Sequence, residues 1–135
     1  MRRVILFSLV ALAALAAGAY ALAGSPSQGM RAFALVDPNG GSPRLIDAHT
    51  NGFVDVSVGP FGPGDYCLTP APGVDVTNTA AVASEEAFYS NAVGIVIVRY
   101  QPNSPDCNAN QLEVKTFTDN PVGPSNQIAF TVIVP

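Results

Sequence analysis

Glycine and proline occur so often along this chain that they limit the length of every element of secondary structure. The 135 residues include 12 Gly and 12 Pro. Proline breaks the interior of a helix and glycine weakens it, so long helices are excluded. The glycines do not recur at every third position, which excludes a collagen helix. The spacing predicts short strands joined by tight turns.

Alternation of apolar and polar residues indicates where the strands lie. The clearest case is 53–58, in which three valines are expected to face the core and two polar residues the solvent: Val54, Val56 and Val58 against Asp55 and Ser57. Similar patterns predict strands at 31–36, 44–49, 66–69, 74–78, 112–118 and 127–134. Asn51-Gly52 is typical of a type I′ hairpin turn, because both residues tolerate positive φ. The first three strands should therefore form an antiparallel meander.

Three other segments need separate interpretation. Ser84, Glu85 and Glu86 resemble a helix start, with a capping residue and two acids at the positive end of the helix dipole; a loop is the alternative. The run 92–100 carries β-branched residues on both faces, which predicts a central strand covered on both sides. The last strand, which ends at Pro135, is expected to lie centrally as well.

About eight short strands, with no helical pattern long enough to connect parallel neighbours, predict an all-β fold. The expected architecture is an antiparallel β-sandwich of Ig-like or jelly-roll-like type, with a small barrel as the alternative. All the predicted strands belong to a single domain, 30–135.

The N-terminal segment has the features of an export signal. Arg2 and Arg3 precede an apolar run at 4–17, and Ala21 and Ala23 then supply the small residues that signal peptidases recognise. We expect a signal peptide at 1–23, cleaved after Ala23, followed by a flexible leader at 24–29. An uncleaved anchor is the alternative, because 4–23 is just long enough to cross a bilayer. After cleavage no membrane span is expected, and the protein should be secreted, either to the medium or to the cell surface.

The charge of the chain limits its partners. Six basic and ten acidic residues give a net charge of −4, and loss of Arg2 and Arg3 with the signal would change it to about −6. A chain of this charge repels nucleic acid and anionic lipid headgroups. We expect neither as a partner.

Two cysteines, Cys67 and Cys107, are present. In an exported chain an even pair of cysteines indicates a disulfide, here between residues 40 positions apart. A redox or metal pair is the alternative. However, the cysteines do not form a CxxC motif, and with His49 as the sole histidine a zinc site cannot be filled by Cys and His alone.

The sequence contains no recognisable catalytic motif. His49 precedes the predicted hairpin turn and no GxSxG motif accompanies it, so it is interpreted as a turn residue. The segment 37–40 resembles part of a calcium loop, yet the later acidic ligands are missing. Aspartates recur at the spacing of the strands themselves and indicate turns and strand edges: Asp37, Asp47, Asp55, Asp65 and Asp75. We therefore expect no enzyme activity, no metal and no cofactor.

Several sequence segments resemble a group of small exported domains from high-GC actinobacteria and their relatives. The shared features are a Tyr-Cys-Leu strand, a second Cys before a Glu-Val-x-Thr strand and a C-terminal Ala-Phe-x-Val-x-Val-Pro, present here at 64–70, 73–75, Cys107, 112–116 and 128–135. The resemblance implies an exported β-domain with a bridge between Cys67 and Cys107. It implies no activity.

These observations favour a secreted or cell-surface module with a binding or structural role and no catalytic activity. Its ligand would be a glycan, a cell-wall polymer or a protein, bound by loops on a rigid sheet. Most aromatic residues are expected to lie in the core, and Phe61, Phe88 and Tyr89 are the alternative candidates for exposure. A small extracellular hydrolase with paired carboxylates and a trimeric jelly-roll tip domain are the alternatives.

Overall fold

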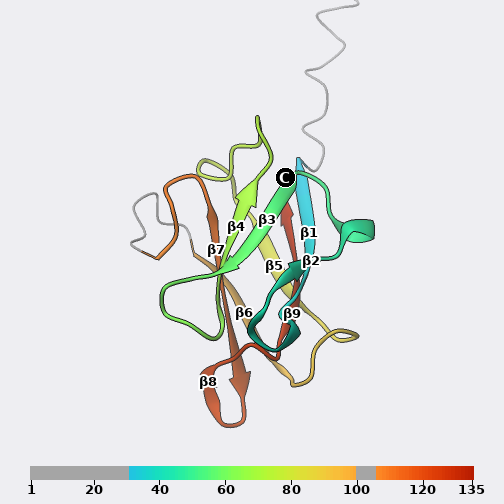
Figure 1. Cartoon of the computed structure of the whole chain (residues 1–135), viewed down its shortest axis with the longest axis vertical. Helices are drawn as coiled ribbons and strands as arrows, with labels where there is room; N and C mark the ends of the chain where they lie inside the picture. Colours follow the sequence, from blue (N-terminus) through green and yellow to red (C-terminus); the bar gives the residue numbers. More distant parts are fainter. Residues whose placement is uncertain (1–30, 100–105) are drawn as a thin grey trace, which may run out of the picture.

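The computed structural model describes residues 31–99 and 106–135. Two antiparallel sheets pack face to face, so the prediction of an antiparallel β-sandwich is confirmed (Figure 1). The predicted signal peptide (1–23), its cleavage residues Ala21 and Ala23, and the leader (24–29) lie outside the described residues. Within the described ranges, no helix is long and apolar enough to span a bilayer.

The first sheet has four strands in the order β2-β1-β9-β5. Their bounds are β1 Ala32–Asp37, β2 Arg44–Leu45, β5 Val82–Glu86 and β9 Ala129–Val134. The C-terminal strand β9 pairs with β1 on one side and with β5 on the other. The expectation that the last strand lies centrally is therefore confirmed.

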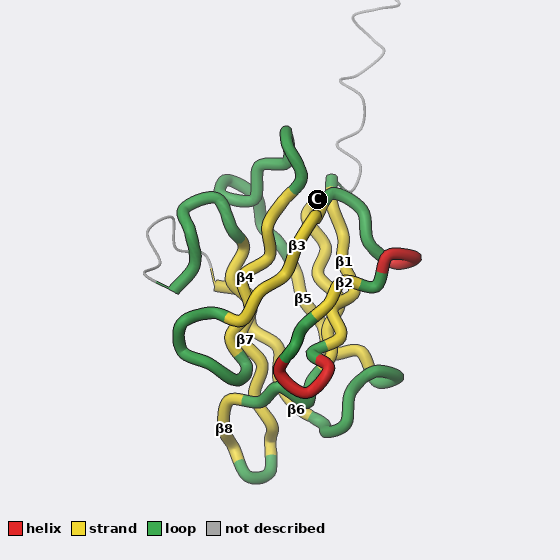
Figure 2. The backbone as a smooth tube through the Cα atoms, viewed as in Figure 1, coloured by secondary structure: helices red, strands yellow, loops and turns green. Residues whose placement is uncertain are grey.

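The second sheet has the order β3-β4-β7-β6, and the short strand β8 also pairs with β7. The bounds are β3 Phe53–Val58, β4 Asp65–Pro70, β6 Gly94–Arg99, β7 Leu112–Asp119 and β8 Val122–Pro124. Two short 3-10 helices, η1 Asn39–Gly41 and η2 Asp47–His49, lie in the connections on either side of β2 (Figure 2).

The core fills the space between the sheets. Alternate residues of the central strands point into it, among them Val36, Tyr66, Leu68, Val114, Phe130 and Val132, all fully buried. The rings of Tyr66 and Phe130 connect the two sheets, with centroids 5.4 Å apart. Burial of each large apolar side chain contributes about 1.5–3 kcal/mol to stability. The same burial raises the pKa of the Tyr66 hydroxyl to about 12.

The predicted meander of the first three strands is wrong. β2 pairs with β1, but 46–49 turns the chain through η2, and β3 pairs with β4 in the other sheet. A type I′ turn needs positive φ at both central residues, and of Asn51 and Gly52 only the glycine has it, at 79°. Asn51 forms an isolated bridge with Phe33 instead. The predicted strand 44–49 is consequently shortened to two residues.

A register shift changes the predicted faces of β3. The pairing with β4 is irregular between Phe53 and Asp55, which places one additional residue in β3. As a result Phe53 and Val56 are buried, whereas Val54 is 59% exposed and Val58 39% exposed. The predicted strand is confirmed, but its buried face is not the one that simple alternation indicates.

Two segments differ in type from their predictions. The segment 74–78 is a turn, because the Asp75 carboxylate accepts hydrogen bonds from the Thr77 N–H, the Thr77 hydroxyl and the Asn78 amide. The segment 84–87, expected to be a helix start or a loop, belongs mostly to strand β5, because pairing with β9 outweighs the local helix signal.

Strand β6 is not central, contrary to its prediction. It lies at the edge of the second sheet and pairs with β7 alone. Val96 and Val98 pack against the core, while Ile95 and Ile97 on the other face are 53% and 45% exposed. The apolar run therefore forms an edge strand with one face exposed to solvent.

Candidate ligand groove

The outer face of the first sheet carries apolar side chains in adjacent rows. Ile133 of β9 is the cross-strand partner of Phe33 on one side and of Val82 on the other. Thr131 similarly pairs with Leu35 and with Ser84. Side chains in such pairs stand about 5 Å apart and form one continuous surface. Because Ile133 and Val82 are 42% and 65% exposed, part of this surface is open to solvent.

The loop after β5 places two aromatic residues beside this surface. The Tyr89 N–H donates to Oε2 of Glu86 at 2.9 Å. The Ser90 hydroxyl donates to the Glu86 carbonyl at 2.6 Å and accepts the Ala129 N–H at 2.9 Å. These bonds fix the loop to both β5 and β9. The Phe88 and Tyr89 rings are 5.0 Å apart and nearly perpendicular, with an interplanar angle of 79°.

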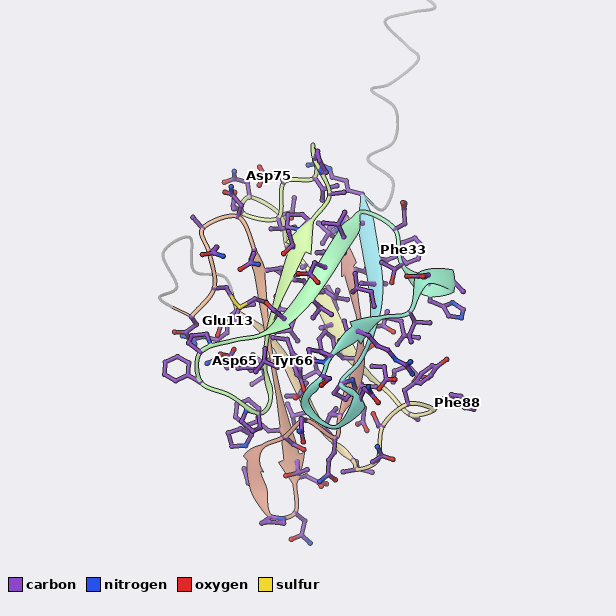
Figure 3. The ribbon with its side chains drawn as sticks, in the orientation of Figure 1. Phe33, Asp65, Tyr66, Asp75, Phe88 and Glu113 are labelled. Carbon is purple, nitrogen blue, oxygen red and sulfur yellow. A yellow bond between two sulfur atoms is a disulfide. The ribbon has the colours of Figure 1, made fainter. Side chains whose placement is uncertain are left out.

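A groove of about 550 Å³ lies between this loop, the sheet and the end of η2. Its lining comprises Phe33, Leu35, His49, Glu86, Phe88, Tyr89 and Thr131. Figure 3 shows Phe33 and Phe88 on the same side of the molecule. We call this feature the aromatic groove. Its size and its mixture of aromatic rings with a few polar groups are typical of small-ligand sites.

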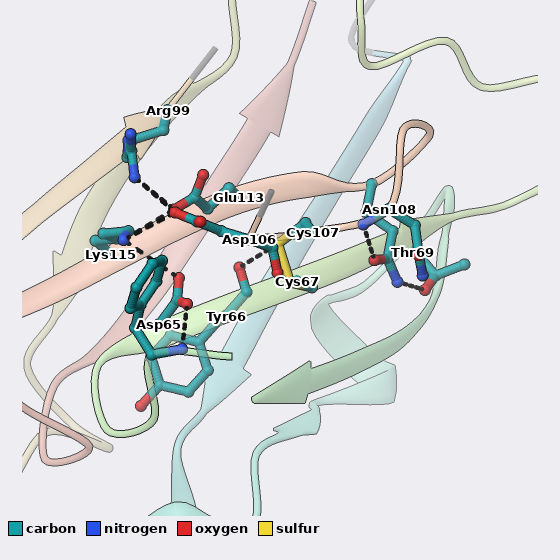
Figure 4. The surroundings of a disulfide bond; sticks show 12 residues. Asp65, Tyr66, Cys67, Thr69, Arg99, Asp106, Cys107, Asn108, Glu113 and Lys115 are labelled. Atoms are coloured by element: carbon teal, nitrogen blue, oxygen red, sulfur yellow. Dashed lines mark hydrogen bonds and ion pairs between the residues drawn. A yellow bond between two sulfur atoms is a disulfide. The ribbon is translucent and has the colours of Figure 1, made fainter. Parts of the chain in front are cut away.

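A second cluster of functional side chains lies on the outer face of the other sheet. It contains three carboxylates and two cations: Asp65, Asp106, Glu113, Arg99 and Lys115. Arg99 contacts Asp106 at 2.8 Å and Glu113 at 3.1 Å. Lys115 contacts Glu113 at 3.1 Å, Asp106 at 3.3 Å and Asp65 at 3.9 Å. We call these five residues the charge network (Figure 4).

The network owes its position to strand pairing and to the disulfide. Asp65 of β4 and Lys115 of β7 are cross-strand partners, as are Arg99 of β6 and Glu113 of β7. Asp106 belongs to the connection before β7, and the adjacent Cys107 is bonded to Cys67 of β4. The predicted disulfide is therefore confirmed, and it holds Asp106 over the sheet.

The carboxylates of the network are all buried. Asp65, Asp106 and Glu113 are 2%, 6% and 2% exposed. The Phe61 ring covers the Lys115 ammonium at 4.6 Å from its centroid, and the Phe61 N–H donates to Oδ2 of Asp65 at 3.3 Å. Asp65 and Glu113 thus face cations and protein, and Asp106 also lines a hollow of about 330 Å³ beside the disulfide. The ion pairs of the network join β4, β6, β7 and the connection before β7.

The environment shifts two pKa values in the network. Desolvation by burial raises the pKa of the Asp65 carboxyl, against the opposing effects of the Phe61 N–H and Lys115. Burial by itself lowers the pKa of Lys115, but hydrogen bonds to Glu113 and Asp106 outweigh it, so the pKa is raised. The surroundings of Lys115 therefore favour its charged form, whereas burial disfavours the charged form of Asp65.

The raised pKa of Asp65 predicts a pH dependence of stability. A carboxyl group whose pKa is raised in the folded state contributes fully below its unfolded value of 3.8, and this contribution is lost as pH rises through the folded value. Asp65→Asn, which stays neutral, should therefore gain stability relative to the wild type between acid and neutral pH. Urea unfolding of both proteins at several pH values measures this difference.

Asp75→Asn is the matched control, with the opposite sign. Hydrogen bonds from the Thr77 and Asn78 side chains lower the pKa of Asp75 to about 2. Its contribution is present above 3.8 and is lost as pH falls toward about 2, so Asp75→Asn should lose stability relative to the wild type as pH rises. The same sign for both variants would contradict the pKa directions.

The other residues considered as candidates in the sequence lie in different elements of the structure. Asp37, in the segment that resembles a calcium loop, accepts two hydrogen bonds from Arg44 and one from the Asn39 N–H. Asp47 and His49 lie in η2, and Asp55 is exposed on β3. In ranges 31–99 and 106–135, no group of three His, Cys, Asp or Glu residues is arranged to hold a metal ion.

Phe61, Phe88 and Tyr89 are the aromatic residues that the sequence leaves as candidates for exposure. Phe61 is 67% exposed and Phe88 84% exposed, while Tyr89 is half-buried against its neighbours. The contributions of Phe33, Leu35 and Glu86 to the groove were missed, because strand pairing brings them there. Comparison with protein families, with curated proteins and with solved structures found no match to this chain. The resemblance to small exported domains therefore stays a prediction.

Proposed function

We propose that this protein is an exported, non-catalytic binding module that holds its ligand in the aromatic groove. The observation that carries the proposal is Phe88, which is 84% exposed although its loop is fixed by hydrogen bonds to β5 and β9. Phe88 lines the groove together with Phe33 and Tyr89, and a concave site with several aromatic side chains is typical of ligand binding. The disulfide and the signal-like segment 1–23 support export.

The ligand is a glycan or cell-wall polymer segment in this proposal. Aromatic rings and a rigid sheet offer a binding surface that loses little conformational entropy when a ligand arrives. The groove is open on the sheet face and adjoins the apolar row of Phe33, Ile133 and Val82, so a chain-like ligand extends along the strands. The protein thereby acts by attachment rather than by turnover.

The hydrolase alternative receives less support. Such an enzyme needs two carboxylates facing a substrate cleft. The three acids that converge here are at most 6% exposed, and each lies within 4 Å of a lysine or arginine nitrogen. This distribution favours binding over hydrolysis.

Alanine substitution in the groove tests the proposed function. Phe88→Ala and Tyr89→Ala should each weaken binding at least about tenfold in a screen against glycans and cell-wall polymers, because they remove aromatic contacts. The free energy of unfolding should change by less than about 0.5 kcal/mol for Phe88→Ala, since the ring is exposed. Co-sedimentation and microarray binding measure the first effect, and urea unfolding the second.

Phe61→Ala serves as the control, because this exposed aromatic residue lies on the loop between β3 and β4, away from the groove. It should bind as the wild type does. Equal binding by the wild type and both groove variants to every ligand retained in the screen would disprove the proposed site.

A further inference from the structure

The charges around the aromatic groove are unevenly distributed. Its lining includes the Glu86 carboxylate and the His49 imidazole but no lysine or arginine. Among the lysines and arginines of the described ranges, Arg44 pairs with Asp37, and Arg99 and Lys115 belong to the charge network on the other sheet. The fourth, Arg31, is exposed just before β1 and does not line the groove. The chain as a whole has a net charge of −4. The groove therefore attracts positive charge and repels negative charge.

A hydrogen bond holds the Glu86 side chain in place. Its Oε2 accepts the Tyr89 N–H at 2.9 Å, so the carboxylate is tied to the base of the aromatic loop. Glu86 is also a cross-strand partner of Ala129, within the rigid part of the first sheet. A charge that is fixed before the ligand arrives contributes more to binding than one that must be ordered.

The aromatic rings add a second attraction for the same kind of ligand. Phe88 and Tyr89 stand at 79° to one another and both line the groove, where Phe33 contributes a third ring from β1. The face of an aromatic ring carries partial negative charge and attracts an ammonium group within about 6 Å. Aromatic rings on several sides, together with a carboxylate, form the usual recognition site for alkylated ammonium ions.

We propose that the aromatic groove recognises an alkylammonium group, held by the carboxylate of Glu86 and the rings of Phe33, Phe88 and Tyr89. This inference rests on the proposed function, since it names the chemical group that the binding module selects. The group has two chemical sources: a quaternary ammonium of the choline type and the primary amine of an amino sugar. A neutral or anionic polymer is the poorer ligand in both cases.

Titration of the full chain with choline and with its neutral isostere 3,3-dimethylbutan-1-ol tests the proposal. The two compounds share shape and size, and differ in the positive charge. Choline should bind at least about tenfold more tightly and shift the NMR signals of Phe33, Phe88, Tyr89 and Thr131. A parallel titration with a glucosamine oligomer and its N-acetylated form distinguishes the two sources, because acetylation removes the charge.

Two variants locate the effect. Glu86→Gln removes the charge while an amide oxygen still accepts the Tyr89 N–H, so it should reduce the preference for choline over the isostere to the part that the aromatic rings supply, and leave folding intact. Glu85→Gln is the control: its Oε2 accepts the Gly94 N–H, and Glu85 does not line the groove. It should keep the preference.

Equal affinities for the charged and neutral compounds in the wild type would overturn the inference, as would an unchanged preference in Glu86→Gln. The proposed function is judged separately, by the loss of polymer binding in Phe88→Ala. If Phe88→Ala loses polymer binding but the wild type does not prefer choline to its neutral isostere, the proposed binding function is supported and the ammonium specificity is disproved. If Phe88→Ala binds its polymer normally, the groove itself is not the site.

Discussion

Replacement of both cysteines by alanine should lower the free energy of unfolding by about 4 kcal/mol. The disulfide closes a 40-residue separation between Cys67 and Cys107. In the chain-entropy description, closing a loop of this size stabilises a fold by roughly that amount. Because single domains are stable by only about 5–15 kcal/mol, the variant should unfold at a much lower urea concentration. Urea unfolding followed by circular dichroism measures the change.

The effect should extend to the charge network, since Asp106 adjoins Cys107. Asp106→Asn should therefore cost less in the cysteine-free protein than in the wild type, and a double-mutant cycle measures this coupling. Reductant is the control: it should destabilise the wild type and leave the cysteine-free variant unchanged. A reduced wild type as stable as the oxidised protein would contradict the prediction.

Lys115→Met should be the most damaging single change in the charge network, with a loss of about 3 kcal/mol. The substitution removes the ammonium that lies within 4 Å of three carboxylates, so Asp65 loses its ion pair and the other two buried acids must share Arg99. Breaking a buried ion pair on one side costs about 3–5 kcal/mol. We expect the lower end, because the Lys115 side chain is 17% exposed and water reaches it. Urea unfolding at neutral pH measures the loss.

Arg44→Met is the matched control. Arg44 contacts Asp37 at 2.8 Å, a shorter distance than any of the Lys115 contacts, but its side chain is 59% exposed. Surface ion pairs contribute about 0–1 kcal/mol, so this variant should be close to the wild type. Equal losses in Lys115→Met and Arg44→Met would show that burial does not set the strength of these pairs.

The sheet architecture was predictable from residue patterns, and the pairing of the strands was not. Alternation located most of the strands, and the turn residues separated them. The failures have physical causes. Asp75 replaced a predicted strand with a side-chain-stabilised turn, and cross-strand pairing with Phe130 and Ala129 made a strand of Glu85 and Glu86 despite their helix signal. Local propensity decides such segments only when no partner strand is available.

The candidate site was predictable in part. Phe88 and Tyr89 were candidates for exposure, since no regular pattern buries them; Phe88 is largely exposed and Tyr89 is half-buried. The remainder of the groove was not recognisable, because Phe33 and Thr131 belong to β1 and β9, which are far apart in the sequence. Pairing through Ile133 and Leu35 brings them together.

The charge network illustrates a different limit. Glu113 and Lys115 stand two residues apart on β7, so alternation correctly places them on one face, opposite Leu112 and Val114. Their burial depends on Asp106 and Phe61, which cover that face. A pattern within one strand shows which residues share a face, but not what lies over it.

The place of β9 in the first sheet determines when this domain can form. β1 and β5 do not pair with each other, and Ala129–Val134 separates them. When the chain emerges from a ribosome or a pore with its N-terminus leading, the strands β1 to β8 emerge before this sheet can close. β1 can pair with β2 before β9 emerges, but β1 and β5 stay unconnected until β9 lies between them, so the first sheet is completed only when this strand is available.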